Sequence, residues 1–152
     1  MAARTKMLRG NAVAKIDEKG RLKLPSHFRA SIAERFGNEL FVTSLYGDCV
    51  WVYPMPSWLA LEARLVKAPS TNPVIRKFRY RVNYFGQTVA MDGQGRILIQ
   101  PLLRDQARME GEVVVLGTDD HLEIWNRAAF EEKMMGELVT PEDLEILSQY
   151  GI

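Results

Sequence analysis

The sequence predicts an α+β fold in which one structural unit occurs twice. The motif Ile16-Asp17-Glu18-Lys19-Gly20-Arg21-Leu22 returns 75 residues later as Met91-Asp92-Gly93-Gln94-Gly95-Arg96-Ile97. Each copy is followed by the same predicted order of helix, β-hairpin and second helix. Because a unit of this size cannot bury its apolar face alone, the two copies are expected to pack together as halves of one fold.

The first copy is predicted to start with a β-hairpin whose strands are residues 11–16 and 21–24. Asp17 suits the first position of the type I turn between them and Gly20 the fourth. A glycine can take the positive φ that a short loop with a bulge requires. Pro25 then opens a helix, because its missing N–H would be unbonded in the first turn.

The other elements follow from hairpin and helix patterns. In the first half they are a hairpin at 39–45 and 49–53, a helix at 57–66 and an amphipathic helix at 74–85. The second copy repeats the order, with strands at 87–91, 96–99, 112–117 and 121–125 and helices at 101–109 and 128–135. A capped acidic helix starts at Thr140. The chain is therefore divided into a flexible basic arm (1–10), a first repeat (11–66), a linker and helix (67–86), a second repeat (87–136) and an acidic tail (137–152).

Composition and charge narrow the possible functions. The chain lacks the apolar run of roughly 20 residues that spans a bilayer, has no secretory signal, and contains one cysteine, Cys49. A cytoplasmic protein without a disulfide or a membrane partner is therefore expected. The formal net charge of +1 divides into +6 for residues 1–30, +4 for residues 31–104 and −9 for residues 105–152. A basic first half favours a polyanion, although ordinary solvated surface explains the same charges about equally well.

The two turns are the best candidates for contacting nucleic acid. A two-stranded tip fits the major groove, and arginine binds guanine O6 and N7 bidentately. The tip residues are Lys19 and Arg21 in the first copy and Gln94 and Arg96 in the second, while Arg9 and Lys15 are candidates for phosphate contacts. The alternative is that Arg21 and Arg96 only pair with Asp17 and Asp92. The two interpretations are compatible, since one contact can orient an arginine that also binds DNA.

An enzyme is a weaker interpretation. Paired carboxylates can divide acid and base roles, but Asp17 and Asp92 both occupy positions that turn formation already explains. His27 and His121 have no nucleophile motif nearby, and no spacing indicates a metal site or a dinucleotide loop. We therefore expect no catalysis, no cofactor, no metal and no small-molecule substrate.

The two copies are not identical, and the differences predict unequal tips. Gln94 replaces Lys19, so the second tip should bind phosphate less strongly than the first. Leu98 replaces Lys23, which makes the second return strand apolar on both faces and predicts that it is more deeply buried. Asp17, Gly20, Asp92 and Gly95 are the structural residues of both turns.

Nearly the whole chain resembles the MraZ family of bacterial transcriptional regulators. The resemblance rests on Arg9-Gly10, on Ile16 to Pro25 with Phe28-Arg29, on Tyr53-Pro54-Met55-Pro56-Ser57-Trp58, on Asn72-Pro73-Val74 and on Met91 to Arg96. It implies an AbrB/SpoVT-like fold in which two hairpin units form a swapped-hairpin β-barrel flanked by helices. It also implies a ring-shaped homo-oligomer, associated with the nucleoid, that binds short direct repeats of double-stranded DNA upstream of the division and cell-wall gene cluster, including its own gene. Lys19, Arg21 and Arg96 match the DNA-binding positions of the family.

A protein-interaction module of AbrB-like fold, such as an antitoxin, is the competing hypothesis. In that case the acidic segment from Glu131 to Glu145 would be the functional part. The two hypotheses differ in which end of the molecule binds the partner.

Overall fold

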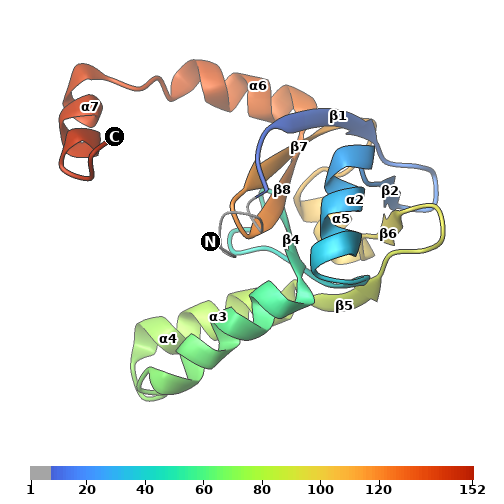
Figure 1. The fold of residues 1–152 in the computed structure, drawn as a ribbon, viewed down its shortest axis with the longest axis horizontal. Helices are drawn as coiled ribbons and strands as arrows, with labels where there is room; N and C mark the ends of the chain where they lie inside the picture. Colours follow the sequence, from blue (N-terminus) through green and yellow to red (C-terminus); the bar gives the residue numbers. More distant parts are fainter. Residues whose placement is uncertain (1–7) are drawn as a thin grey trace.

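The computed structural model describes residues 8–152 and confirms the α+β fold (Figure 1). Six antiparallel strands form one sheet, and two further strands form a separate ribbon. In spatial order the sheet contains β1 (Asn11–Lys15), β7 (Glu112–Thr118), β8 (His121–Asn126), β4 (Val50–Pro54), β3 (Glu39–Thr43) and β5 (Gln87–Ala90). The ribbon contains β2 (Arg21–Lys23) and β6 (Arg96–Leu98).

Two of the four predicted hairpins are confirmed, and the two at the repeated turns are wrong. The strands β3–β4 and β7–β8 pair as expected. In contrast, β1 pairs with β7, β5 pairs with β3, and β2 pairs with β6. The first turn keeps only the isolated bridge between Ile16 and Leu22. The reason is burial: pairing β2 with β6 sets Leu22 opposite Ile97, and both side chains are almost completely enclosed.

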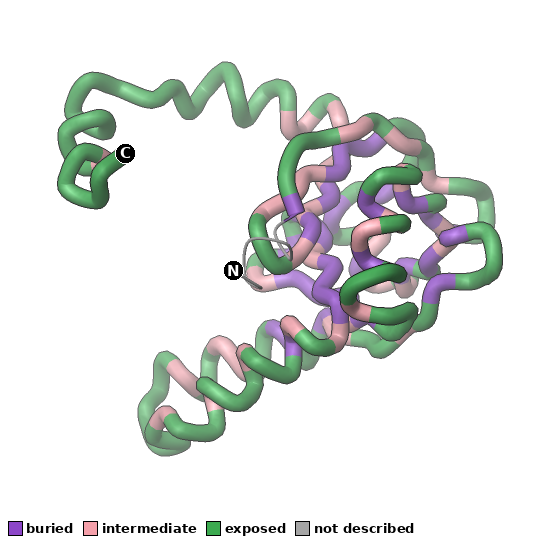
Figure 2. The backbone as a smooth tube through the Cα atoms, viewed as in Figure 1, coloured by how far each residue is buried: buried purple, intermediate pink, exposed green. Residues whose placement is uncertain are grey.

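The core is built from equivalent residues of the two copies. Helix α2 (Ser26–Arg35) buries Phe28, and helix α5 (Pro101–Gln106) buries Leu103, which lies 75 residues later. The residues that follow the two ribbon strands, Leu24 and Ile99, are enclosed as well. Figure 2 shows that the buried residues concentrate in the sheet, the ribbon and the helices beside them. Each copy therefore covers the apolar face of the other, as expected from the repeat.

Helices α3 (Met55–Lys67) and α4 (Pro73–Tyr84) confirm the two helices predicted there and project together from the body (Figure 1). At their base Trp58 stacks on Phe41, with ring centroids 4.5 Å apart. The side chain of Asn72 caps α4 by accepting a hydrogen bond from the N–H of Val74. This pair of helices leaves most of its surface exposed (Figure 2).

The second copy ends in helices α6 (Arg127–Gly136) and α7 (Pro141–Ser148), also as predicted. Thr140 and Asp143 form a capping box at the start of α7, which stabilises this short helix. Almost every residue of α7 is exposed, and Figure 1 shows it standing apart from the sheet. Among the described helices none has the length and apolar character that crossing a membrane requires.

The flexible arm expected at residues 1–10 does not extend to residues 8–10. Residues 1–7 lie outside the described residues. Leu8 is only 3% exposed, and its backbone N–H and carbonyl both bond to Asp119, at 2.6 and 3.0 Å. The carbonyl of Gly10 accepts from Gly117 at 2.8 Å. These backbone hydrogen bonds continue the edge of the sheet beyond β1, and the side chain of Leu8 fills part of the core.

Candidate nucleic-acid interface

The carboxylate of Asp17 holds the first turn together. Its Oδ1 accepts hydrogen bonds from the backbone N–H groups of Lys19 and Arg21, both at 2.9 Å. Its Oδ2 accepts from Nε of Arg21, also at 2.9 Å. Gly20 completes the turn with φ +80°, a conformation that glycine adopts without strain. Asp17 therefore shapes the turn and also fixes the direction of the arginine side chain.

The second turn has the same geometry with different residues at its exposed positions. Oδ1 of Asp92 accepts from the N–H groups of Gln94 and Arg96, at 2.8 and 2.9 Å. Oδ2 accepts from Nε of Arg96 at 2.7 Å, and Gly95 has φ +75°. Nε is the bonded atom of the arginine in both turns. Nη1 and Nη2 of each arginine make no hydrogen bond to any other part of residues 8–152.

These hydrogen bonds lower the pKa of both carboxyl groups. The backbone N–H of Arg96 is the main cause for Asp92, and the pKa there falls to about 2. The equivalent N–H of Arg21 is the main cause of the lowered pKa of Asp17. Both carboxylates are therefore charged at neutral pH and keep the two arginines oriented.

Each turn is supported by the other copy. The N–H of Leu24 donates to the carbonyl of Gly95 at 2.9 Å, and the N–H of Ile99 donates to the carbonyl of Gly20 at 3.1 Å. Arg29 of α2 also donates from Nη2 to the carbonyl of Gly93 at 2.7 Å. The two turns are therefore fixed relative to one another as parts of one unit.

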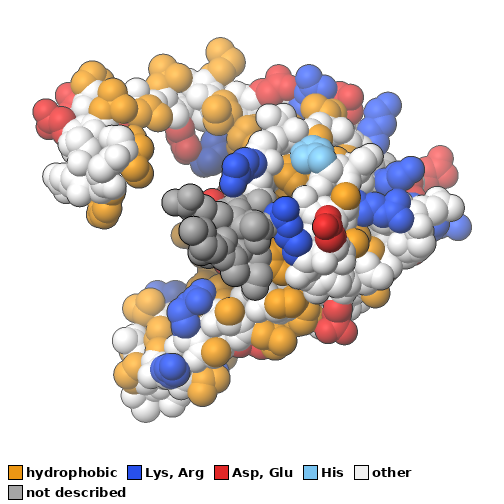
Figure 3. Space-filling model, viewed as in Figure 1, with side chains coloured by type: hydrophobic (Ala, Val, Ile, Leu, Met, Phe, Trp, Pro, Cys, Tyr) orange, Lys and Arg blue, Asp and Glu red, His pale blue; other side chains and the backbone are white. Residues whose placement is uncertain are grey.

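The pairing of β2 with β6 brings the two arginines onto one surface. Arg21 lies opposite Leu98, and Lys23 lies opposite Arg96. Since side chains alternate along a strand, these four point outward while Leu22 and Ile97 point into the core. We call the surface formed by Arg21, Lys23, Arg96 and Leu98 the ribbon face. Lys and Arg side chains are visible at this end of the molecule in Figure 3.

The structure contradicts the predicted burial of the second return strand, and it adds two residues to the candidate interface. Leu98 is 44% exposed, and β6 has the same burial pattern as β2, so the expected deeper burial of the second strand is wrong. Only one side of the ribbon faces the core, which leaves the other side open whatever its residue type. Lys23 on this face and the supporting Arg29 were missed as functional candidates. Arg29 and Arg104 are 75 residues apart, as are the two turn arginines. This repeated offset is the sequence signal that could have identified the arginines that support the turns.

The other candidate residues lie at different distances from the ribbon face. Lys19 and Gln94 are exposed at the tips of the two turns. Lys15 is the exposed last residue of β1, in register with Glu112. Arg9 lies beyond the other end of β1, roughly 26 Å along the chain from Asp17 at about 3.3 Å per residue. The structure thus gathers the turn residues with Lys15 and separates them from Arg9.

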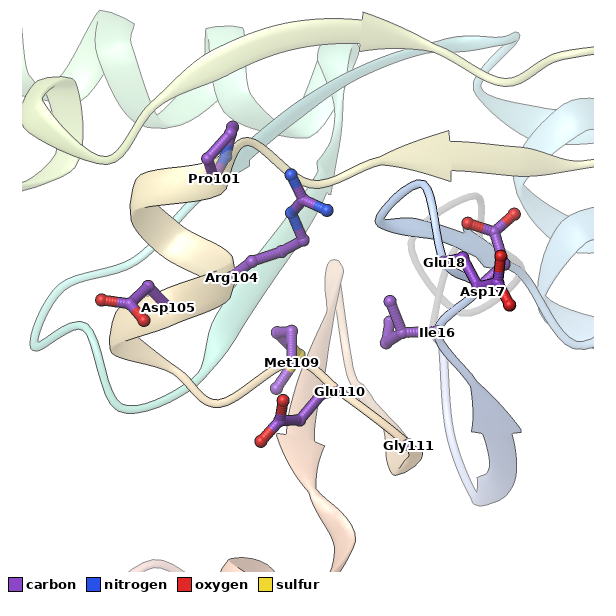
Figure 4. A pocket seen from close by; sticks show the side chains of 9 residues that line it. All are labelled: Ile16, Asp17, Glu18, Pro101, Arg104, Asp105, Met109, Glu110 and Gly111. Atoms are coloured by element: carbon purple, nitrogen blue, oxygen red, sulfur yellow. The ribbon is translucent and has the colours of Figure 1, made fainter.

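A hollow lies beside the first turn, but its chemistry does not suit a phosphate. Figure 4 shows Arg104 reaching from α5 toward the turn, above a rim of carboxylates. The lining residues are Ile16, Asp17, Glu18, Pro101, Arg104, Asp105, Met109, Glu110 and Gly111. One basic and four acidic side chains favour cations over anions, so the ribbon face remains the candidate interface.

The two histidines have structural surroundings. His121 stacks on Tyr53 with centroids 4.3 Å apart, and its Nδ1 lies 2.8 Å from a carboxylate oxygen of Asp120. Burial, together with the neighbouring carboxylates of Asp120 and Glu123, raises the pKa of Tyr53 to about 12. His27 packs against Phe28 at 4.0 Å between ring centroids. Within residues 8–152 no group of three or more His, Cys, Asp and Glu side chains is placed to hold a metal ion.

Known proteins resemble this chain over both copies of the unit. The model of a family described as "MraZ protein, putative antitoxin-like" matches residues 7–80 and 86–136, which include both turns and the ribbon. This is most of the chain. The chain belongs to the MraZ family.

Members of the MraZ family from several bacteria are similar along most of this chain. The "Transcriptional regulator MraZ" of Acidobacterium capsulatum is 43% identical over 146 residues, covering 96% of this chain and 100% of that protein. The protein of the same name from Koribacter versatilis is also 43% identical, and the one from Escherichia coli K12 is 32% identical over 129 residues. Its coverage is 84% of this chain and 85% of the E. coli protein. The MraZ family consists of transcriptional regulators rather than enzymes, which confirms the resemblance and the expectation of a non-enzyme.

Proposed function

We propose that the chain is a sequence-specific DNA-binding regulator that contacts its target through the ribbon face and the two turns. The observation that carries this proposal is the β2–β6 register, which presents the arginines of both turns together with Lys23 on one exposed surface. Its target is a set of short direct repeats upstream of the division and cell-wall gene cluster, including its own gene. The protein acts in the cytoplasm, at the nucleoid.

The geometry of the ribbon face matches the major groove. A two-stranded ribbon enters this groove, and arginine there binds guanine O6 and N7. Arg21 and Arg96 are diagonal neighbours across the ribbon, a relation that separates Cα atoms by about 7–8 Å. This spacing is about two base steps of 3.4 Å. Two guanines in one groove are therefore within reach of one ribbon.

The turn aspartates support this role by preparing the arginines for binding. Each accepts a hydrogen bond from Nε, and the two terminal nitrogens of each arginine have no hydrogen bond to another described residue. The side chain loses less conformational freedom when it binds a base, because the protein has already oriented it. Asp17 and Asp92 are positioning residues in this account, and the arginines contact DNA.

The proposed fold class is the AbrB/SpoVT-like barrel of swapped hairpins. It is supported by the exchange of partners between the copies: β2 leaves the first turn to pair with β6 of the second copy. The carbonyl of each turn glycine also accepts a hydrogen bond from the strand end of the other copy. In this arrangement one chain supplies two units that support each other's turns.

We also propose that copies of the chain assemble into a ring through α4 and α7. Helix α4 carries Arg76, Lys77, Arg79 and Arg81 and no acidic residue, whereas α7 carries Glu142, Asp143 and Glu145 and no basic residue. Residues 8–152 contain no ion pair that involves either set. Exposed apolar side chains accompany both charge sets: Tyr80 and Tyr84 on α4, and Leu144, Ile146 and Tyr150 in and after α7. Figure 3 shows such side chains along α6 and α7. A second copy that offers its α7 to this α4 satisfies both charge and apolar surface.

Charge reversal tests the assembly directly. Arg76→Glu with Lys77→Glu, and separately Glu142→Lys with Glu145→Lys, should each reduce the assembled mass measured by sedimentation. Mixing the two variants should restore assembly, because the α4 of one then meets a complementary α7 of the other. Unchanged mass in either single variant contradicts this interface.

The DNA-binding proposal is tested with a duplex from the region immediately upstream of the chain's own gene. Arg21→Ala with Arg96→Ala should lose at least about 1–3 kcal/mol per guanine contact, measured by fluorescence anisotropy. Arg64→Ala is the matched control, because Arg64 is exposed on α3, away from the ribbon. Equal affinity of the double variant and the control would overturn the proposal, provided both remain folded and assembled.

An antitoxin-like function is the second candidate, because the description of the family itself includes that term. It predicts a stoichiometric protein partner that is lost when residues 137–152 are deleted and retained in the double arginine variant. The DNA-binding regulator predicts instead that binding to the upstream duplex is lost in the double arginine variant.

A further inference from the structure

We propose that the ribbon face reads DNA in one orientation, with Leu98 contacting a thymine methyl at one end and Lys23 contacting a guanine at the other. This inference rests on the proposed function and assigns two residues to it that differ between the copies. Its basis is the cross-strand pairing, which combines each turn arginine with a residue of the other copy.

The two ends of the ribbon face are related by an approximate two-fold axis between β2 and β6. The axis exchanges Arg21 with Arg96 and Lys23 with Leu98, as the antiparallel register requires. The two positions of the first pair are therefore both arginine, whereas the two positions of the second pair, Lys23 and Leu98, differ in chemistry. One end carries Arg21 and Leu98, and the other carries Arg96 and Lys23.

The end with Leu98 is suited to an arginine contact beside an apolar one. Leu98 is 44% exposed and is the apolar member of the ribbon face. Thymine is the base whose methyl group offers an apolar contact in the major groove. Leu98 next to Arg21 therefore favours a thymine adjacent to the guanine that Arg21 binds.

The end with Lys23 is suited to a second guanine. Lys23 is exposed, and its side chain makes no hydrogen bond or ion pair to another described residue. Lysine binds guanine O6 and N7, as arginine does, so Lys23 beside Arg96 extends the reading of guanine at this end. A symmetric dimer matches a palindrome, whereas a face with unlike ends matches an element of fixed polarity. This polarity is the property that a direct repeat requires.

The test uses single-repeat duplexes from the DNA immediately upstream of the chain's gene. Replacing one thymine at a time with deoxyuridine removes only the methyl group. At one position this replacement should lower the affinity of the unaltered protein for the duplex about fourfold, which is the effect of exposing one methylene-sized apolar group. In Leu98→Ala the same replacement should have no effect, while deoxyuridine elsewhere should act equally on both proteins.

The other end is tested with 7-deazaguanine, which lacks the N7 acceptor. Lys23→Ala should weaken binding about fivefold, near the lower limit for a good base contact. In this variant the penalty for 7-deazaguanine should shrink at a guanine on the opposite side of the element from the Leu98-dependent thymine. Arg64→Ala should show all the penalties of the unaltered protein.

The outcomes separate this inference from the function on which it rests. If the unaltered protein binds the upstream duplex, but Leu98→Ala and deoxyuridine act independently at every position, the polarity proposal is wrong and the DNA-binding proposal stands. The same holds if both residues depend on bases at one end. If the unaltered protein does not bind the duplex, both proposals fail.

Discussion

The turns at residues 17–20 and 92–95 have the same internal hydrogen bonds but different contacts with the residues around them. Within each turn an aspartate accepts the same three hydrogen bonds and orients the same nitrogen of an arginine. Around them the copies differ: Arg29 bonds to the backbone of the second turn, whereas Nε of Arg104, its equivalent beside the first turn, is buried with no hydrogen-bond partner among residues 8–152. The comparison separates residues that build a turn from residues that give each turn its own properties.

The largest expected effect tests whether both copies contribute equally to the core. Leu22→Ala and Ile97→Ala remove opposite, fully enclosed side chains, so each should destabilise the protein by about 2–5 kcal/mol. Chemical denaturation measures both values. A loss below 1 kcal/mol for one of them would mean that its copy folds without the shared ribbon.

The turn glycines should show the next largest effect. Gly20→Ala and Gly95→Ala place a Cβ at positive φ, against the side chains of Arg104 and Arg29 respectively. The backbone conformation alone costs about 1–2 kcal/mol. Gly93→Ala is the matched control, because Gly93 has open space around it and should change stability by less than about 0.5 kcal/mol. Thermal melts of the three variants make the comparison, and equal losses would contradict it.

A smaller effect on stability is expected from removing Arg29 or Arg104, the arginines that lie beside the two turns. Arg29→Ala removes the hydrogen bond to the Gly93 carbonyl and should cost about 1 kcal/mol, with faster amide exchange at residues 92–95. Arg104→Ala removes a side chain that makes no equivalent bond within the described residues, so amide exchange in the first turn should change less. Hydrogen-exchange mass spectrometry distinguishes the two turns. Greater loosening of the first turn would reverse the account.

The smallest effect is the acid dependence of the two turns. Because the folded-state pKa of Asp92 is about 2 and its ordinary value is 3.8, its contribution to stability is complete above about pH 4. It is lost as the pH falls from about 4 through 2, and Asp17 shifts in the same direction. NMR titration of the carboxyl carbons should show both midpoints below 3.8. In Arg96→Ala the shift of Asp92 should decrease but persist, since the backbone N–H is its main cause.

The sequence was sufficient to predict the turns but not what lies between them. Asp17, Gly20 and their equivalents act within five residues, so local pattern identified them, and the β3–β4 and β7–β8 hairpins are local for the same reason. The partners of β1 and β2 lie far along the chain, and their register depends on jointly burying Leu22 and Ile97. Without that register Leu98 was expected inside, and Lys23 was not placed beside Arg96. Arg9 was grouped with the turns by charge, although β1 separates them in space.

Methylation interference on a single-repeat upstream duplex tests the central claim that both turn arginines act on one surface. Among the guanines whose N7 methylation blocks binding, we expect one that depends on Arg21 and one that depends on Arg96, about two base pairs apart in one major groove. Arg21→Ala should abolish sensitivity at one of them and Arg96→Ala at the other. Sensitive guanines a full helical turn apart, or one guanine that depends on both arginines, would contradict the shared ribbon face.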